Sequence, residues 1–202
     1  MRSKTWNKEH ADDPYVQRAH KEGWRSRAVY KLEELDQKYN LIQPGMSIID
    51  LGAAPGGWSQ YVAKRVGGKG KVIAIDVLDM ESINSVNFIQ GDFTEQEIYE
   101  SLREIVGQNP IDLVLSDMAP NISGISSVDQ PRAMYLAELA ADFALEVLSK
   151  DGGLLVKLFQ GAGFDDYVKM LRSKFTKVLI RKPEASRARS RETYALATHI
   201  KL

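Results

Sequence analysis

The segment that most constrains this chain runs from Asp50 to Trp58, with the sequence DLGAAPGGW. An apolar run, 46–49, precedes it, and a helix-like stretch, 59–66, follows it. A strand, a glycine-rich turn and a helix start in this order bring backbone N–H groups close to a bound cofactor. The segment therefore predicts an α/β domain with a cofactor site at this strand-to-helix turn.

The glycine spacing argues against a pyrophosphate ligand. The dinucleotide fingerprint needs a second glycine where this chain has Ala53, so a nicotinamide-dependent oxidoreductase is disfavoured. Asp50 before the first glycine and Asp76 at the end of the next apolar run instead suit a ligand with ribose hydroxyls and a cationic centre. S-adenosylmethionine fits this description. An ordinary tight turn is the alternative that the motif alone leaves open.

Length and composition favour one well-buried domain, since the chain has 202 residues of which 44% are hydrophobic. We expect a single domain over 1–202, with 1–45 as a basic, helical N-terminal extension packed on the core. The chain has no cysteine, which excludes disulfides and thiolate zinc sites and fits a reducing compartment. Because no apolar run is long enough to cross a bilayer, we expect a cytoplasmic protein without a membrane partner.

Apolar runs predict seven strands, near 46–51, 71–76, 86–90, 111–116, 153–158, 176–181 and 193–199. Helical spacing occurs at 25–39, 59–66, 94–106, 131–148 and 164–174. Pro131 is expected in a first helical turn, and Gly152-Gly153 after a helix end. We predict a Rossmann-like, seven-stranded, mostly parallel α/β sheet with helices on both faces. The segment from Lys182 to Glu192 is short for a helical crossover, so the last two strands are expected to pair antiparallel.

The net charge of zero conceals a division along the chain. Residues 1–31 hold 8 Lys and Arg against 4 Asp and Glu, residues 169–202 hold 10 against 2, and residues 32–168 hold 9 against 21. If both ends fold onto one face, that face suits a phosphate backbone, whereas scattered solvated lysines are the plainer interpretation. Clustered arginines favour the first interpretation, because neighbouring guanidiniums bind phosphate oxygens well. The predicted RNA-binding residues are Arg25, Arg27, Arg187, Arg189 and Arg191.

Polar residues stand where several predicted strands end. Ligands of open α/β sheets bind beyond the carboxyl ends of the strands, and this chain places Asp50, Asp76, Asp92, Asp117 and Lys157 there. Asp92 alone could equally cap the following helix. Lys157 interrupts the apolar run 154–159, where an unpaired ammonium is very costly. It therefore needs a partner or a chemical role, unless its side chain reaches the rim of the sheet.

Five stretches together resemble the FtsJ/RlmE family of S-adenosylmethionine-dependent RNA ribose 2′-O-methyltransferases, and the resemblance extends from about residue 14 to the C-terminus. The stretches are 25–31, 50–58, 116–121, 156–161 and 186–192. The resemblance implies a class I methyltransferase fold. It also places the family's Lys-Asp-Lys-Glu tetrad on Lys31, Asp117, Lys157 and Glu192, with Lys157 as the proton acceptor. The implied cofactor contacts are Gly56, Trp58, Asp76, Asp92 and Asp117.

The likeness is strongest to compact bacterial members, which methylate a uridine ribose in the A-loop of large-subunit (23S) ribosomal RNA. It implies the same reaction on the assembled large subunit, with S-adenosylmethionine as methyl donor and no obligate protein partner. No metal is expected, because the donor already carries an activated methyl group. Methylation of a transfer-RNA anticodon loop and noncatalytic RNA binding remain as alternatives. A noncatalytic protein, however, has no use for Lys157 in an apolar strand.

Overall fold

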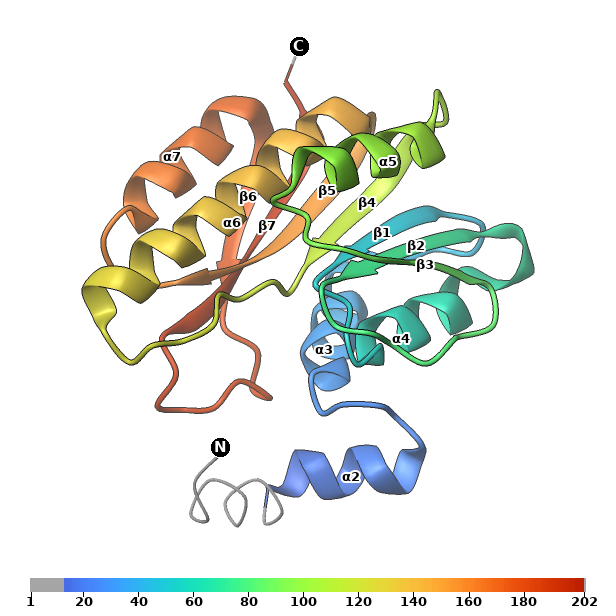
Figure 1. Cartoon of the computed structure of the whole chain (residues 1–202), viewed down its shortest axis with the longest axis horizontal. Coiled ribbons are helices and arrows are strands. Elements are labelled where there is room, and N and C mark those ends of the chain that lie inside the picture. Colours follow the sequence, from blue (N-terminus) through green and yellow to red (C-terminus); the bar gives the residue numbers. More distant parts are fainter. Residues whose placement is uncertain (1–12, 202) are drawn as a thin grey trace.

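The computed structural model describes residues 13–201 and forms a seven-stranded sheet in the order β3-β2-β1-β4-β5-β7-β6 (Figure 1). Strands that neighbour one another from β3 to β5 are parallel, and β7 is antiparallel to both β5 and β6. The predicted Rossmann-like sheet with an antiparallel end is therefore confirmed. The strands are β1 (Ser47–Leu51), β2 (Lys71–Asp76), β3 (Val86–Gln90), β4 (Ile111–Ser116), β5 (Leu148–Phe159), β6 (Phe175–Arg181) and β7 (Glu192–Ile200).

Helices cover both faces of the sheet. Helices α5, α6 and α7 lie on one face, and α3 and α4 lie on the other, with α2 beyond α3 (Figure 1). Successive strand residues alternate between the two layers, as Ile48 and Ile49 do in β1, so the central strands are buried on both faces. The helices are α2 (Pro14–Glu22), α3 (Val29–Tyr39), α4 (Gly57–Val66), α5 (Gln96–Val106), α6 (Ser126–Val147) and α7 (Phe164–Lys174).

The expected place of Pro131 was wrong, and β5 begins earlier than the predicted strand near 153–158, although Gly152-Gly153 do follow the end of α6. Helix α6 begins at Ser126, so Pro131 lies inside it rather than in its first turn. The carbonyl that a proline leaves without a donor is four residues earlier, at the exposed Ser127, where water can satisfy it. Strand β5 begins at Leu148, and Gly152-Gly153 lie within it. Leu148 pairs with Ile111 and Gly153 with Leu113, so β5 makes an irregular excursion between them.

The N-terminal region holds two helices where the sequence predicted one. Asp13 caps α2 by accepting a 3.0 Å hydrogen bond from the N–H of Tyr15, and Gly23 ends the helix in a left-handed conformation. Helix α3 then starts at Val29, four residues later than predicted. Arg25 and Arg27 therefore lie in the segment that connects α2 to α3.

A buried carboxylate fixes α3 to the rest of the molecule. Asp36 accepts hydrogen bonds from the N–H of Ile42 at 2.8 Å, the hydroxyl of Tyr61 at 2.8 Å and Nε of Arg65 at 3.0 Å. Burial and this carboxylate together raise the pKa of Tyr61. Because Tyr61 and Arg65 belong to α4, the contacts lock α3 against α4 and so set the position of Lys31 on α3.

Candidate active site

The turn from β1 to α4 is pressed against the loop that follows β4. Gly52 has a φ of 79°, and a Cβ there would lie 2.9 Å from backbone atoms of Met118. The amides of Gly52 and Ala53 both donate to the carbonyl of Ile75, which ties the turn to the end of β2. Only glycine fits this close approach without strain, which is why the glycine-rich segment was informative.

A cleft of about 670 Å³ opens beside this turn at the carboxyl ends of the strands. Asp76, Asp92 and Asp117 line it, together with Arg132 and Tyr135 of α6. Three carboxylates against one guanidinium make a cleft that favours a cationic ligand. A few polar side chains in a cleft that is otherwise lined in part by apolar residues are typical of small-molecule sites.

Two of the cleft carboxylates also support the backbone around them. Asp76 accepts from the N–H of Ala54 at 2.9 Å and from that of Leu78 at 2.8 Å, so it fixes both the glycine turn and the loop after β2. Asp92 accepts from the N–H of Thr94 at 2.9 Å and from its hydroxyl at 2.7 Å. Asp92 therefore lines the cleft and closes a turn with Thr94, but it does not cap α5, whose N-terminal cap is Glu95.

Gly56 and Trp58, the other two predicted cofactor contacts, lie outside the cleft. Gly56 has a φ of 104° and ends the turn, and Trp58 is buried with its indole N–H donating to the carbonyl of Ala28 at 2.7 Å. The ring of Trp58 packs at 5.8 Å, centroid to centroid, on that of Tyr194.

The four residues of the predicted tetrad come together beside the cleft from four different elements. Lys157 of β5 is 9% exposed and pairs with Asp117, which follows β4, at 3.1 Å between Nζ and Oδ1. The same ammonium also donates to the backbone carbonyl of Asp117. Lys31 of α3 pairs with Glu192, the first residue of β7, at 2.6 Å. The tetrad is thus two ion pairs.

Tyr194 joins the two ion pairs and was not predicted. Its hydroxyl donates to Oδ1 of Asp117 at 2.7 Å and accepts from Nζ of Lys31 at 3.3 Å. The residue is fully buried and lies opposite Lys157 in the pairing of β5 with β7. A signal for it was present, because strand periodicity puts Tyr194 on the same face as Glu192, two residues before it.

Burial and the neighbouring charges set the pKa values of Asp117 and Tyr194. Burial pushes the pKa of Asp117 upward, but the nearby Lys157 and Lys31 charges and the Tyr194 hydroxyl outweigh it and lower that pKa. Burial, followed by the charges of Asp117 and Glu192, raises the pKa of Tyr194 well above its usual value. At neutral pH the site therefore holds a carboxylate and a phenol that can only be its donor.

Asp50 lies at the end of β1, beneath the glycine turn, and is fully buried. Its Oδ2 accepts from the Ser59 hydroxyl at 2.6 Å, whereas its Oδ1 has no hydrogen-bond partner within the described residues. Burial raises its pKa to about 7, against the hydrogen bond from Ser59 and with help from the charges of Asp117 and Asp76. A buried acid with an unpartnered oxygen favours a cationic group nearby.

The predicted RNA-binding arginines fall into two groups. Arg25 donates to the carbonyls of Glu81 at 2.6 Å and Ser82 at 2.9 Å, and Arg27 pairs with Asp13 at 2.6 Å and donates to the carbonyl of Ala185. These two side chains link segments of the protein to one another by hydrogen bonds. Arg187 is one-third exposed, and Arg189 and Arg191 are exposed, on the segment that leads into β7.

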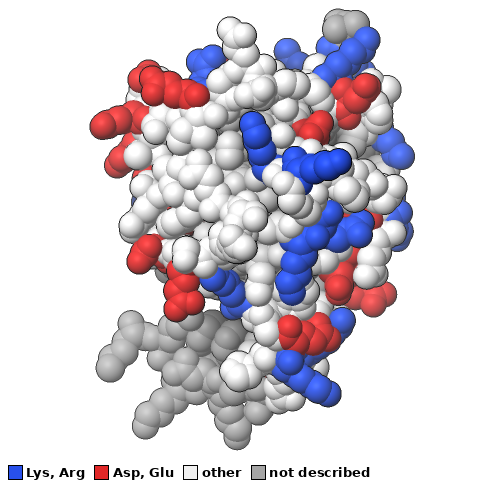
Figure 2. Space-filling model, turned by 90° about the vertical axis from the view of Figure 1, so that its right-hand side faces the viewer, with Lys and Arg blue, Asp and Glu red and all other residues white. Residues whose placement is uncertain are grey.

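Charges of both signs are mixed on the side of the protein seen in Figure 2. Figure 2 shows Lys and Arg side chains across the middle and right of the side that faces the viewer, with Asp and Glu toward the left and the lower right. The division of charge along the chain therefore produces a mixed surface on this side. Exposed arginines next to the tetrad, rather than net charge, suit this region to binding phosphate.

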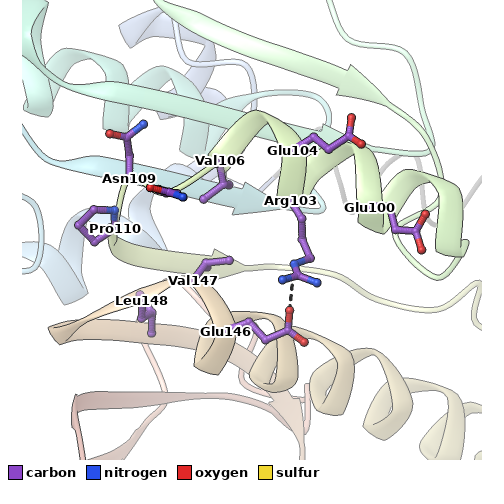
Figure 3. A pocket seen from close by; sticks show the side chains of 11 residues that line it. Glu100, Arg103, Glu104, Val106, Asn109, Pro110, Glu146, Val147 and Leu148 are labelled. Atoms are coloured by element: carbon purple, nitrogen blue, oxygen red, sulfur yellow. Dashed lines mark ion pairs between the residues drawn. The ribbon is translucent and has the colours of Figure 1, made fainter.

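A second hollow, of about 800 Å³, lies between α5 and α6 (Figure 3). Its wall includes the segment Gly107 to Pro110 just before β4, and an Arg103–Glu146 ion pair of 3.1 Å spans it. It is at the amino ends of β4 and β5, the opposite end of the sheet from the tetrad. It contains no tetrad or cleft residue and is not the candidate site.

The described part of the chain contains no group of three or more His, Cys, Asp or Glu side chains arranged to hold a metal ion. Among residues 13–201, no helix is both long and apolar enough to span a membrane.

A Rossmann-like sheet with an acid-lined cleft and a Lys-Asp-Lys-Glu cluster at its carboxyl rim defines a methyltransferase, and comparison with known proteins agrees. Residues 24–200 match the model of the FtsJ-like methyltransferases. The chain is 56% identical to ribosomal RNA large subunit methyltransferase E of Legionella pneumophila, covering 96% of this chain and 95% of the relative. The identity to the protein of that name from Chromohalobacter salexigens is 60%, with coverage of 96% and 93%.

A solved structure from Plasmodium falciparum, described as that of a ribosomal RNA methyltransferase, matches with a TM-score of 0.79. It is 31% identical, and the match covers 88% of this chain and 98% of that one. The chain therefore belongs to the FtsJ-like methyltransferase family, as its motifs predicted.

Asp50 gives a pH-dependence that can be measured in the protein without cofactor. Its folded-state pKa is about 7, whereas an unfolded Asp titrates near 3.8, so the folded state binds more protons between these values. The contribution of Asp50 to stability then falls as pH rises, by about 1.4 kcal/mol per pH unit between pH 5 and pH 6 and by less as the pH approaches 7. Asp50→Asn removes this dependence. We expect urea unfolding at pH 5 and pH 8 to show a larger loss in the parent than in the variant.

The exposed Asp142→Asn is the matched control and should follow the parent. Equal pH-dependence of the unfolding free energy in the parent and in Asp50→Asn would mean that Asp50 is ionised in the folded protein throughout this range.

Proposed function

We propose that this protein transfers a methyl group from S-adenosylmethionine to a ribose 2′-hydroxyl of large-subunit ribosomal RNA, at a uridine of the A-loop. The carrying observation is the network of Lys157, Asp117, Tyr194, Lys31 and Glu192 beside the acid-lined cleft. The names of the relatives support a ribosomal substrate. A single methyltransferase domain over 1–202 and a cytoplasmic location belong to the same proposal, with residues 1–12 outside the described part.

The cleft fits the proposed cofactor. Asp76 and Asp92 keep free lone pairs for ribose hydroxyls and the adenine amino group, and Asp117 faces both the cleft and the tetrad. The unpartnered oxygen of buried Asp50 favours a cationic group at the glycine turn. When bound, S-adenosylmethionine supplies a methyl group already activated on a sulfonium.

The tetrad residues act on the acceptor hydroxyl. A ribose hydroxyl is a poor nucleophile at neutral pH, so it must be held in line and assisted in losing its proton. Lys157 is the group proposed to touch it. As a neutral amine Lys157 accepts the proton, and as an ammonium it donates to the hydroxyl oxygen and stabilises developing negative charge. Asp117 and Tyr194 hold Lys157 and Lys31 in place.

The RNA is proposed to bind through phosphates at the arginine segment, 186–191. Arg191 lies next to Glu192 and its guanidinium is 3.5 Å from the hydroxyl of Ser126, so this segment borders the tetrad. On the same segment Arg189 is exposed, and Arg187 is one-third exposed and pairs with Asp13 at 3.9 Å. For Arg25 and Arg27, contact with RNA stays a prediction, and it requires them to exchange internal carbonyl partners for phosphate oxygens.

The substrate is tested by labelled methyl transfer to large subunits isolated from cells that lack the protein. We expect one 2′-O-methylated uridine, mapped to the A-loop, and faster transfer to assembled subunits than to short naked oligonucleotides. The reason is that a basic docking surface recognises a folded RNA and splays out one nucleotide. Preferential methylation of transfer RNA or capped RNA in a parallel assay would overturn the ribosomal proposal, and binding without methyl transfer would indicate a noncatalytic protein.

Lys157→Ala tests the chemistry. We expect single-turnover methyl transfer to fall at least about 10²-fold, the lower end for positioned acid–base catalysis, with cofactor affinity unchanged. Lys157→Arg keeps a positive charge but cannot act as a base. Substantial activity in Lys157→Arg assigns Lys157 the orienting role, and loss equal to that of Lys157→Ala assigns it the proton. A folded Lys157→Ala protein that methylates at the parental rate removes Lys157 from the mechanism.

The phosphate contacts are tested by replacing Arg187, Arg189 and Arg191 together with alanine. RNA binding should weaken, and the slope of log affinity against log salt should decrease by up to about three phosphate contacts. Cofactor affinity should stay at the parental value, because the cleft is untouched. The exposed pair Lys169→Ala and Arg172→Ala on α7 serves as a control for loss of charge alone. Identical salt slopes in the triple variant and the parent would contradict this placement.

A further inference from the structure

Ser186 stands out because it is a buried polar residue at the start of the arginine segment, whose Arg189 and Arg191 are exposed. Only 7% of Ser186 is exposed. Its hydroxyl donates to Oε1 of Glu192 at 2.9 Å. Lys31 contacts the same oxygen at 2.6 Å. One carboxylate oxygen of the tetrad thus has two donors, one from α3 and one from the arginine segment.

The backbone around Ser186 is held at several points. The N–H of Ser186 donates to the carbonyl of Pro183 at 2.9 Å, and the N–H of Glu184 donates to the side chain of Glu34 at 2.7 Å. Arg27 donates to the carbonyl of Ala185. Glu34 lies on α3, one turn from Lys31, so the same helix holds both the segment and the lysine. Ser186 is therefore a fixed donor and not a mobile surface hydroxyl.

The backbone of Glu192 is anchored by contacts separate from the one that Ser186 makes to its carboxylate. Its backbone N–H donates to the hydroxyl of Ser190 at 3.2 Å, and its backbone pairs with Phe159 in the sheet. These contacts fix the main chain but not the side-chain torsions. On the carboxylate itself Ser186 shares Oε1 with Lys31, which also donates to the hydroxyl of Tyr194 at 3.3 Å. A hydrogen bond to a charged group from a rigid donor is among the stronger orienting contacts in proteins.

We propose that Ser186 is a positioning residue for methyl transfer, which orients Glu192 toward Lys31 and connects the phosphate-binding arginine segment to the tetrad. The inference rests on the proposed function, since it assigns Ser186 a part in that reaction. It implies that a phosphate held by Arg187 acts next to the residue that orders the tetrad. Ser186 does not touch either substrate, so its loss should affect the rate of the chemical step rather than ligand binding.

The test compares single-turnover methyl transfer at saturating cofactor and large subunits. Ser186→Ala should lower the rate about tenfold, the consequence expected of losing one charge-assisted hydrogen bond. Affinities for RNA and cofactor should stay within about twofold of the parent. Ser186→Thr, which keeps a hydroxyl, should recover most of the rate. Ser173→Ala is the matched control, because that hydroxyl is exposed on α7 and bonds only its own helix at Met170.

A double-mutant cycle separates a positioning role from a general structural one. In a Glu192→Ala background, Ser186→Ala should have no further effect on the rate, because its partner is absent. Additive effects would overturn the proposal, as would a parental rate in Ser186→Ala or a loss confined to RNA affinity. If Ser186→Ala does not fold, Ser186→Cys keeps the size and weakens the donor, and a parental rate there is equally decisive. The parent's own activity on large subunits tests the proposed function separately.

Discussion

The structure depends on the neutralisation of one buried ammonium. Lys157 lies in the middle of an apolar strand, where an unpaired charge would cost several kcal/mol. Asp117 offsets that cost through an ion pair of 3.1 Å. The buried carboxylate of Asp117 itself needs hydrogen-bond donors, and the hydroxyl of Tyr194 is one of them. Tyr194 in turn accepts from Lys31, whose charge Glu192 balances. Each polar group in the network is satisfied by the next, and removing one leaves another unpaired.

Such a network requires elements distant in sequence to be held in fixed register. Parallel pairing of β4 with β5 puts Asp117 beside Lys157, and antiparallel pairing of β5 with β7 places Tyr194 opposite Lys157. The reversal of β7 brings the start of that strand, Glu192, to the rim where the parallel strands end. Lys31 is the member supplied by a helix, and Asp36 holds that helix in place.

Much of this architecture was predictable because strands that are buried on both faces have continuous apolar sequences. The candidate site was predictable because ligands of such sheets bind beyond the carboxyl ends of the strands. Lys157 could be predicted because it is a charged residue in an apolar run. Tyr194 was not predicted, because an aromatic residue in an apolar strand resembles an ordinary core residue. The excursion at the start of β5 depends on its pairing with β4, and the early start of α6 depends on solvent access at Ser127. Local sequence propensity does not predict either feature.

The same geometry separates two ligands of opposite charge. The cleft is lined by Asp76, Asp92 and Asp117 and so attracts a cation, while exposed arginines border the other side of the tetrad and attract an anion. Between them the tetrad pairs each of its two lysines with a carboxylate. The proposed donor is cationic and the proposed acceptor is polyanionic, so a strong charge of either sign at the tetrad would repel one of them. Pairing the lysines with carboxylates satisfies burial and keeps the local charge small, which suits the approach of both proposed ligands to the same few atoms.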